Sequence, residues 1–211
     1  MSGIHLALLG MSFGGGLPDI GAAYEGGFFA GQISTAGNGI ADYNLVIAPK
    51  SSGETSGKQW KTSNTSTAGT SSVIDGPTNS SNMNNASHPA AEFCEGLTIG
   101  SFSDWYMPAK NELEVCYFNL KPTTTSNSTD SGTNTNAVPS RGSNYTAGTP
   151  AQTAATDFQT GNTEELIASV YFSSTEASAS NAFFQNLNAG NQGDRSKTDS
   201  LYVRAVRRVA V

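Results

Sequence analysis

The chain has 211 residues, of which 13% are charged, and its formal net charge is −6 at pH 7. This length suits one large domain or two small ones. The low charge content excludes the charge-rich class of disordered chains. The negative balance disfavours nucleic acid as a partner, because binding a phosphate backbone needs clustered Lys and Arg. Ten Phe, seven Tyr and two Trp are available to anchor a core, since each aromatic side chain buries a large area.

Residues 1–24 form an apolar and then glycine-rich segment that differs from the rest of the chain. No Lys or Arg precedes its apolar run at residues 4–11, so the basic start of a secretory signal is missing. No run of about 18 apolar residues exists, so we expect no membrane span. We therefore expect the chain to fold in a cytoplasm. We expect residues 1–24 to attach it to another subunit or a larger particle, and not to remain a loose tail.

The first regular elements resemble a β-hairpin. Residues 27–33 and 43–48 are short apolar runs, and the glycines and Asp42 between them suit a turn. Pro49 ends the second strand. Residues 51–82 are rich in Ser, Thr, Asn and Gly and predict a long ordered loop pinned by Trp60. A flexible linker is the alternative for this stretch.

Two helices are predicted next, over residues 84–97 and 108–120, because apolar residues recur at helical spacing in both. The aromatic turn at residues 100–108 separates them and should lock the second helix against a sheet. Cys94 and Cys116 each fall on the apolar stripe of one helix. We expect free buried thiols, with a disulfide as the alternative. The chain has two histidines and no C-x-x-C motif, so no metal site is predicted.

The remainder predicts a long irregular stretch and then strands. Residues 122–163 are a low-complexity Thr/Ser/Asn stretch of the kind that is either functional or mobile. Strands are predicted at residues 168–173, 181–187 and 201–209, the last with Arg204, Arg207 and Arg208 among valines. A hairpin, two helices, loops and then several strands make an α+β order.

Four pieces in series resemble a known family: the stretch Asp104-Trp105-Tyr106-Met107-Pro108 with Glu112-Leu113, then residues 171–176, then 181–183, then 202–207. The series is similar to the C-terminal domain of Legionella collagen-like adhesins and to many phage tail-fibre-type proteins. These belong to the C-type-lectin-like and formylglycine-generating-enzyme-like fold group. The similarity spans roughly residues 26–209.

The resemblance implies an α+β, C-type-lectin-like domain over residues 25–211, with small twisted mixed sheets, two flanking helices and long loops. It implies that residues 173–176 start a ligand-binding face and that Arg204 and Arg207 lie on the last strand. Two positions depart from the family: Phe172 stands where Trp is common, and Ala109 stands where Ser or Thr would complete a capping box with Glu112. The resemblance and the apolar pattern together give the expected core, which consists of Trp60, Cys94, Trp105, Tyr106, Leu113, Cys116, Val203 and Val206.

Catalysis is not expected. A nucleophile needs an adjacent base, but His88 precedes Pro89 in a first helical turn, where a surface or capping role is expected. Formylglycine generation would require cysteines late in the domain, and no Cys follows Cys116. The triplets of calcium-dependent lectins are absent. Glu176, Asp194 and Asp199 could supply oxygen ligands but are more typical of solvated loop charges. We expect no cofactor.

The segment 178–197 is the predicted binding region, because it mixes aromatic and amide side chains that suit sugar or protein recognition. A hairpin with ordinary polar exposure is the alternative. The candidate ligand-binding residues, with Glu176 just before the segment, are Glu176, Asn181, Phe183, Gln185, Asn188, Asn191, Gln192, Asp194 and Arg195.

The functional hypothesis is a non-catalytic virion component, assembled in the host cytoplasm, such as a tail-fibre, spike or head-decoration subunit. It would display the lectin-like domain to a host-surface glycan or protein and attach to other virion proteins through residues 1–24. We expect a homo-oligomer, with a trimer favoured by analogy with fibres. The alternatives are a bacterial surface or secreted adhesin module and a purely architectural capsid or tail subunit.

Overall fold

The computed structural model describes residues 16–211, and they form two five-stranded sheets with short helices between them. The first sheet has the order β1-β2-β3-β10, and β5 pairs with β2. All its pairs are antiparallel. The predicted hairpin forms its centre as β2 and β3. The strands are β1 (Ala23–Tyr24), β2 (Gly27–Ile33), β3 (Tyr43–Ile47), β5 (Ala137–Val138) and β10 (Val206–Ala210).

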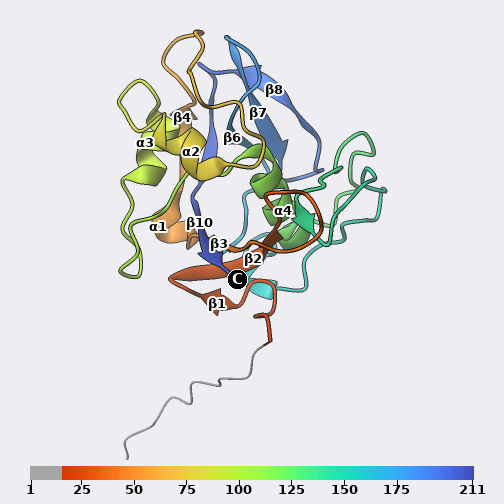
Figure 1. Cartoon of the computed structure of the whole chain (residues 1–211). Helices are drawn as coiled ribbons and strands as arrows, with labels where there is room; N and C mark the ends of the chain where they lie inside the picture. Colours follow the sequence, from red (N-terminus) through yellow and green to blue (C-terminus); the bar gives the residue numbers. More distant parts are fainter. Residues whose placement is uncertain (1–15) are drawn as a thin grey trace, which may run out of the picture.

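The second sheet has the order β4-β9-β6-β7-β8. Its pairs are antiparallel except for β6 and β9, which run parallel. Figure 1 shows the two sheets towards opposite ends of the molecule. The strands of the second sheet are β4 (Glu54–Gln59), β6 (Val170–Glu176), β7 (Asn181–Asn186), β8 (Gln192–Ser196) and β9 (Ser200–Arg204).

The helices are short, apart from α4, which packs in the middle of the molecule (Figure 1). Two sheets, one antiparallel and one mixed, with few helices confirm the α+β class. In α4 the Glu112 carboxylate accepts from the Ala109 N–H at 2.8 Å. This is half of a capping box, because the Ala109 side chain has no oxygen to complete it. The helices are α1 (Lys50–Gly53), α2 (Gly76–Ser81), α3 (Pro89–Glu95), α4 (Lys110–Leu120) and the 3-10 turn η1 (Thr156–Phe158).

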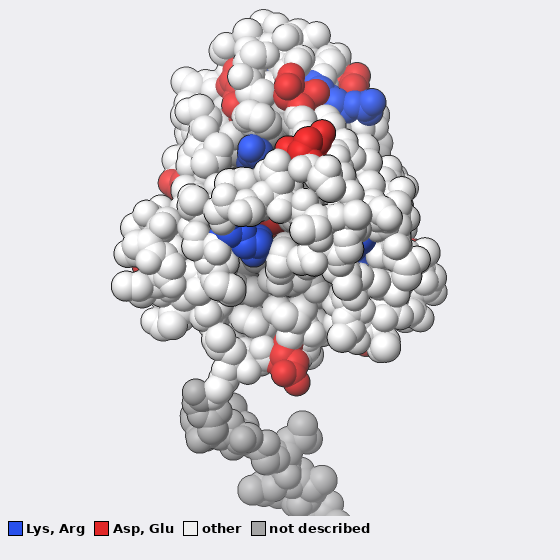
Figure 2. Space-filling view, turned by 90° about the vertical axis from the view of Figure 1, so that its right-hand side faces the viewer, with Lys and Arg blue, Asp and Glu red and all other residues white. Residues whose placement is uncertain are grey.

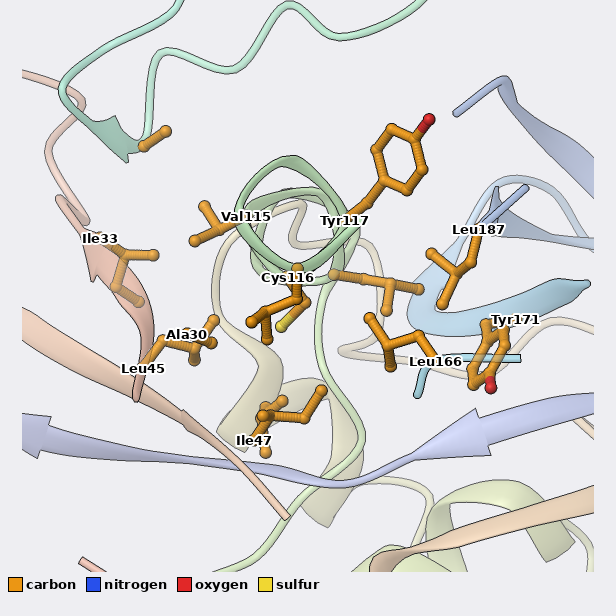
Figure 3. Close-up of a cluster of buried hydrophobic side chains, with 14 of the residues drawn as sticks. Ala30, Ile33, Leu45, Ile47, Val115, Cys116, Tyr117, Leu166, Tyr171 and Leu187 are labelled. Atoms are coloured by element: carbon orange, nitrogen blue, oxygen red, sulfur yellow. The ribbon is translucent and has the colours of Figure 1, made fainter. Parts of the chain in front are cut away.

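The larger core surrounds α4. Figure 3 shows Val115, Cys116 and Tyr117 of the helix between side chains of the first sheet on one side and of the β6–β7 region on the other. The helix therefore joins the two sheets. The labelled neighbours are Ala30, Ile33, Leu45, Ile47, Leu166, Tyr171 and Leu187.

A second core cluster is built on the two tryptophans. The indole N–H of Trp60 donates to the Ser173 carbonyl at 3.0 Å, and that of Trp105 donates to the Phe102 carbonyl at 3.1 Å. Both rings can therefore be buried without an unsatisfied donor. All eight expected core residues are buried: Trp60, Cys94, Trp105, Tyr106, Leu113, Cys116, Val203 and Val206. The two cysteines are free.

The expectation of one closing strand over residues 201–209 was wrong. The chain instead passes from the second sheet to the first at Ala205, which separates β9 from β10. The Ala205 N–H donates to the Gly53 carbonyl at 2.9 Å, and its carbonyl accepts from the Ala48 N–H at 3.0 Å. The sequence does not indicate this change of sheet, because the alternation of the side chains over residues 202–209 continues without a break.

Three other boundaries differ from expectation. Residues 51–82 hold most of α1, all of β4 and all of α2 and are not a loop throughout. The sequence of β4, Glu-Thr-Ser-Gly-Lys-Gln, is polar because the strand lies at a sheet edge. The helix expected over residues 84–97 is confined to α3, and β8 was expected only in the alternative that made the segment 178–197 a hairpin.

Part of the N-terminal segment 1–24 belongs to the folded structure. Residues 23–24 form β1 and pair with β2, and the Gly21 N–H donates to the Phe29 carbonyl at 2.8 Å. The Ile20 side chain packs against the larger core. Residues 1–15, with the apolar run, lie outside the described residues. Within residues 16–211 no helix is both long and apolar enough to cross a membrane.

Candidate ligand-binding face

The predicted binding segment folds as the β7–β8 hairpin, with Phe183 paired to Asp194 and Gln185 to Gln192. Side chains alternate between the two faces of a strand, so Phe183 and Gln185 share one face of the hairpin with their partners Asp194 and Gln192. Phe183 and Gln192 line a hollow of about 230 Å³. The other lining residues come from β8, the start of α4, the loop 130–133 and Asn144.

The hollow combines a flat ring with opposite charges and amides. The Lys110 ammonium lies 4.9 Å from the centre of the Phe183 ring, within the range of a cation–π contact. Asp130 accepts hydrogen bonds from the hydroxyls of Ser128 and Ser131, which hold its pKa below the usual value. The carboxylate is therefore charged at neutral pH. A ring face beside hydrogen-bonding groups suits a sugar or a short peptide.

The loop that closes the hollow depends on one glycine. Gly132 has a φ of 111°, and a Cβ at this position would overlap the ring of Tyr145. The Ser131 hydroxyl accepts from the Gln192 N–H at 3.0 Å and ties the loop to β8. These contacts hold both walls of the hollow in a fixed arrangement.

A second hollow, of about 370 Å³, shares Asn144 with the first. It is lined by Phe118, Arg141 and Tyr145, among others. The Arg141 guanidinium lies 4.0 Å from the Phe118 ring centre and pairs with the buried Glu114. Sequence reasoning missed these residues, although the low-complexity stretch 122–163 was marked as functional or mobile. In the sequence, only the presence of an Arg and a Tyr within that stretch indicates the second hollow, and this indication is weak.

Two predicted ligand-binding residues hold the fold instead. The Glu176 carboxylate pairs with Lys197 at 2.8 Å and accepts from the Thr67 N–H and the Thr70 hydroxyl, each at 2.9 Å. Gln185 is 1% exposed and its amide donates to the Gly190 carbonyl at 2.8 Å. The prediction that these two side chains face a ligand was wrong, because both are engaged inside the domain.

The remaining five predicted residues are spread along the hairpin and line neither hollow. The Asn181 amide donates to the exposed Asp194 carboxylate at 2.5 Å. Asn188 accepts from the hydroxyls of Thr123 and Thr125. Arg195 is exposed, and the Asn191 carbonyl accepts from the Asn186 N–H. The structure thus brings together two of the nine predicted residues, Phe183 and Gln192.

Neutral side chains dominate the molecule on the side drawn in Figure 2, where the Lys, Arg, Asp and Glu residues are few and scattered. A surface of this kind recognises ligands through hydrogen bonds and ring contacts more than through long-range charge.

The two cysteines and the one histidine of the described residues are buried. Burial raises the pKa of both the Cys94 and Cys116 thiols, which disfavours the reactive thiolate. Burial, with the nearby Lys61 and Lys197, lowers the pKa of His88 to about 4. Among residues 16–211, no group of three His, Cys, Asp or Glu is placed to hold a metal ion.

No protein-family model matches the chain, and no curated protein matches it. Among solved structures, a fimbrial protein from Bacteroides ovatus is similar, with a TM-score of 0.44 and 18% sequence identity. The alignment covers 77% of this chain and 35% of that one, so this chain spans about a third of the length of the fimbrial protein. The score is too low to assign that protein's fold or role to this chain.

Proposed function

We propose that this chain is a non-catalytic binding domain with a C-type-lectin-like fold, displayed on a phage virion as a tail-fibre, spike or head-decoration subunit. One observation carries the fold proposal: the aromatic motif and the closing strand are bonded to each other. Asp104 pairs with Arg207 at 2.7 Å, Tyr106 and Val206 exchange backbone hydrogen bonds, and Glu112 pairs with Arg208. Two of the pieces that carry the family resemblance therefore form one unit.

The binding role is supported by the hollow lined by Phe183, Lys110 and Gln192, which offers a ring, a cation and an amide on fixed elements. The non-catalytic role is supported by the burial of both thiols, which raises their pKa, since an activated thiol requires a lowered one. The virion assignment rests on the sequence resemblance and on the apolar segment 1–24.

Glycan-array binding by the full chain tests the proposal, and the comparison is between alanine variants of two neighbouring phenylalanines. Phe183→Ala removes the ring from the hollow, and we expect about tenfold weaker glycan binding, the equivalent of about 1.4 kcal/mol. Phe184→Ala is the matched control, because Phe184 lies next in β7 and does not line the hollow. Circular dichroism verifies that both variants fold.

Equal binding by both variants would exclude this hollow as the glycan site. If no glycan is retained while light scattering shows a tight oligomer, the architectural alternative is favoured. A monomer both with and without residues 1–15 would contradict the oligomeric part of the proposal; the deletion stops there because Ile20 packs on the core and β1 pairs with β2.

A further inference from the structure

Another hollow lies elsewhere in the described residues and shares no lining residue with the proposed glycan site. It measures about 660 Å³, which is within the range of ligand pockets, about 300–1,000 Å³. One wall is the face of β4 and β9 that carries Glu54 and Tyr202. The other walls are α1 and the segment 161–167.

Lys50, Glu54 and Glu165 line the hollow, and Arg204 and Glu164 belong to the same charged cluster without lining it. One carboxylate of the cluster lacks a full partner. Lys50 pairs with Glu165 at 2.9 Å, and Arg204 pairs with Glu164 at 2.7 Å. Glu54 is the surplus carboxylate, because its distance to Arg204 is 3.6 Å, too long for a good hydrogen bond. Three carboxylates against two cations give the cluster a net charge of −1.

The Glu54 side chain is built into the wall and has an oxygen to spare. It is 6% exposed, and its Oε2 accepts from the Tyr171 hydroxyl at 2.7 Å. Its Oε1 accepts no hydrogen bond from residues 16–211, although the residue lines the hollow. Burial raises the pKa of this carboxyl, so its charge lacks solvation that a bound donor could replace.

Tyr202 provides an aromatic wall beside this carboxylate. Its ring stacks on buried Tyr171 with centroids 5.3 Å apart, and Tyr202 itself lines the hollow. An aromatic ring next to a carboxylate attracts a cation through both its quadrupole and the opposite charge. Hydroxyl and amide groups of Ser51, Ser56 and Asn162 at the same hollow can accept further hydrogen bonds from an ammonium or guanidinium.

We propose that this hollow is a second binding site, which receives the Arg or Lys side chain of a partner protein. The guanidinium or ammonium donates to Glu54 Oε1 and lies against the Tyr202 ring. The cluster's net charge becomes zero when the cation enters. An anionic ligand is disfavoured because the surplus charge of the site is negative.

The test adds two small probes to the full chain and detects their binding through the backbone amide NMR signals of residues 50–56 and 161–167. Nα-acetyl-arginine methylamide supplies the cation, and Nα-acetyl-citrulline methylamide has nearly the same shape without charge. We expect the arginine probe to shift these signals with a dissociation constant on the order of 1 mM. The citrulline probe is expected to bind at least about tenfold more weakly.

Two variants and one control separate the site from folding effects. Glu54→Gln removes the carboxylate, and Ser56→Lys places a competing cation at an exposed position of the hollow that should not disturb the core. Both are expected to weaken arginine binding at least about tenfold. Glu92→Gln removes the same charge from an exposed position on α3 and should leave binding unchanged.

Equal binding of the two probes, or shifts confined to other residues, overturns the proposal. So does the absence of any shift at probe concentrations of about 10 mM, tenfold above the expected constant. A neutral methyl glycoside that shifts these signals while the arginine probe does not would identify a sugar site instead. Because this hollow and the glycan site share no residue, either proposal can fail without the other.

Discussion

Glu112 is the buried charge on which the junction of α4, the aromatic turn and β10 depends. It is 0% exposed and accepts hydrogen bonds from the Tyr106 hydroxyl at 2.6 Å, the Ala109 N–H at 2.8 Å and Arg208 Nε at 2.8 Å. We predict that Glu112→Gln strongly destabilises the domain, although the amide has nearly the same volume as the carboxylate.

The size of the effect follows from two losses. The side-chain NH₂ of the introduced glutamine is a donor, whereas the carboxylate oxygen that it replaces is an acceptor. In the place of Oε2 it would face the Ala109 N–H, so two donors would meet and one of them would lose its partner. The Arg208 guanidinium, whose side chain is 11% exposed, would keep only a 4.0 Å contact with Asp75 as a counter-charge. Breaking a buried pair costs about 3–5 kcal/mol. For a domain of this length, that corresponds to a melting temperature lower by roughly 6–20 °C.

Urea unfolding followed by tryptophan fluorescence measures this free energy. The exposed Glu92→Gln on α3 is the control and should change the unfolding free energy by less than about 0.5 kcal/mol. Arg208→Met and the double variant complete a cycle that isolates the coupling between the two charges. A Glu112→Gln protein within about 1 kcal/mol of the parent, or a coupling near zero, refutes the reasoning.

Three further outcomes are expected. His88, with a pKa of about 4, should give an NMR titration midpoint near that pH. In the unfolded chain this imidazole has its ordinary pKa of 6.5, so the contribution of His88 to stability should fall as the pH drops from about 6.5 to 4. A titration midpoint near 6.5 in the folded protein contradicts this. Cys94 and Cys116 should react with a thiol reagent such as DTNB only after unfolding, and rapid modification of the native protein argues against their burial. Trp60→Phe leaves the Ser173 carbonyl without its indole donor and should lower the unfolding free energy by about 1–3 kcal/mol, whereas an unchanged urea midpoint would show that the bond contributes nothing.

Elements with strong apolar periodicity were predictable from the sequence. The β2–β3 hairpin and α4 were found near their true bounds, because each buries an apolar pattern against the core. Trp60 was correctly expected to anchor its polar stretch in the core, and Trp105 was expected there from the aromatic turn and the family resemblance. By contrast, β4 and β8 are polar edge strands, whose pairing depends on the neighbouring strand more than on their own residues.

The irregular stretch 122–163 could not be read from residue type, because its interior is held by polar side chains. The Asn136 amide donates to the Ser34 carbonyl at 2.8 Å, and the Asn127 amide donates to the Pro150 carbonyl at 2.8 Å. Buried amides of this kind replace backbone pairing. In a sequence they are indistinguishable from the amides of a solvated loop.

The candidate site was predictable only in its hairpin half. An alternating strand places neighbouring residues on opposite faces, and the face that meets the rest of the molecule depends on distant segments. Phe183 and Gln185 lie two residues apart and share one face of β7, yet Gln185 is buried and bonded to the Gly190 carbonyl whereas Phe183 lines the hollow, because different segments pack over each. Lys110 and Asn144 reach the same place from other parts of the chain, and no local spacing indicates that they meet.

The switch at Ala205 has a consequence for the order of folding during synthesis. β9 is an internal strand of one sheet and β10 pairs with β3 in the other, so residues 200–210 contribute a strand to each. Strands β3 and β4 leave the ribosome early, but β3 acquires its partner β10 and β4 its partner β9 only when the last residues emerge. Neither sheet reaches its native order before then, so the nascent chain carries unpaired strand edges through most of its translation.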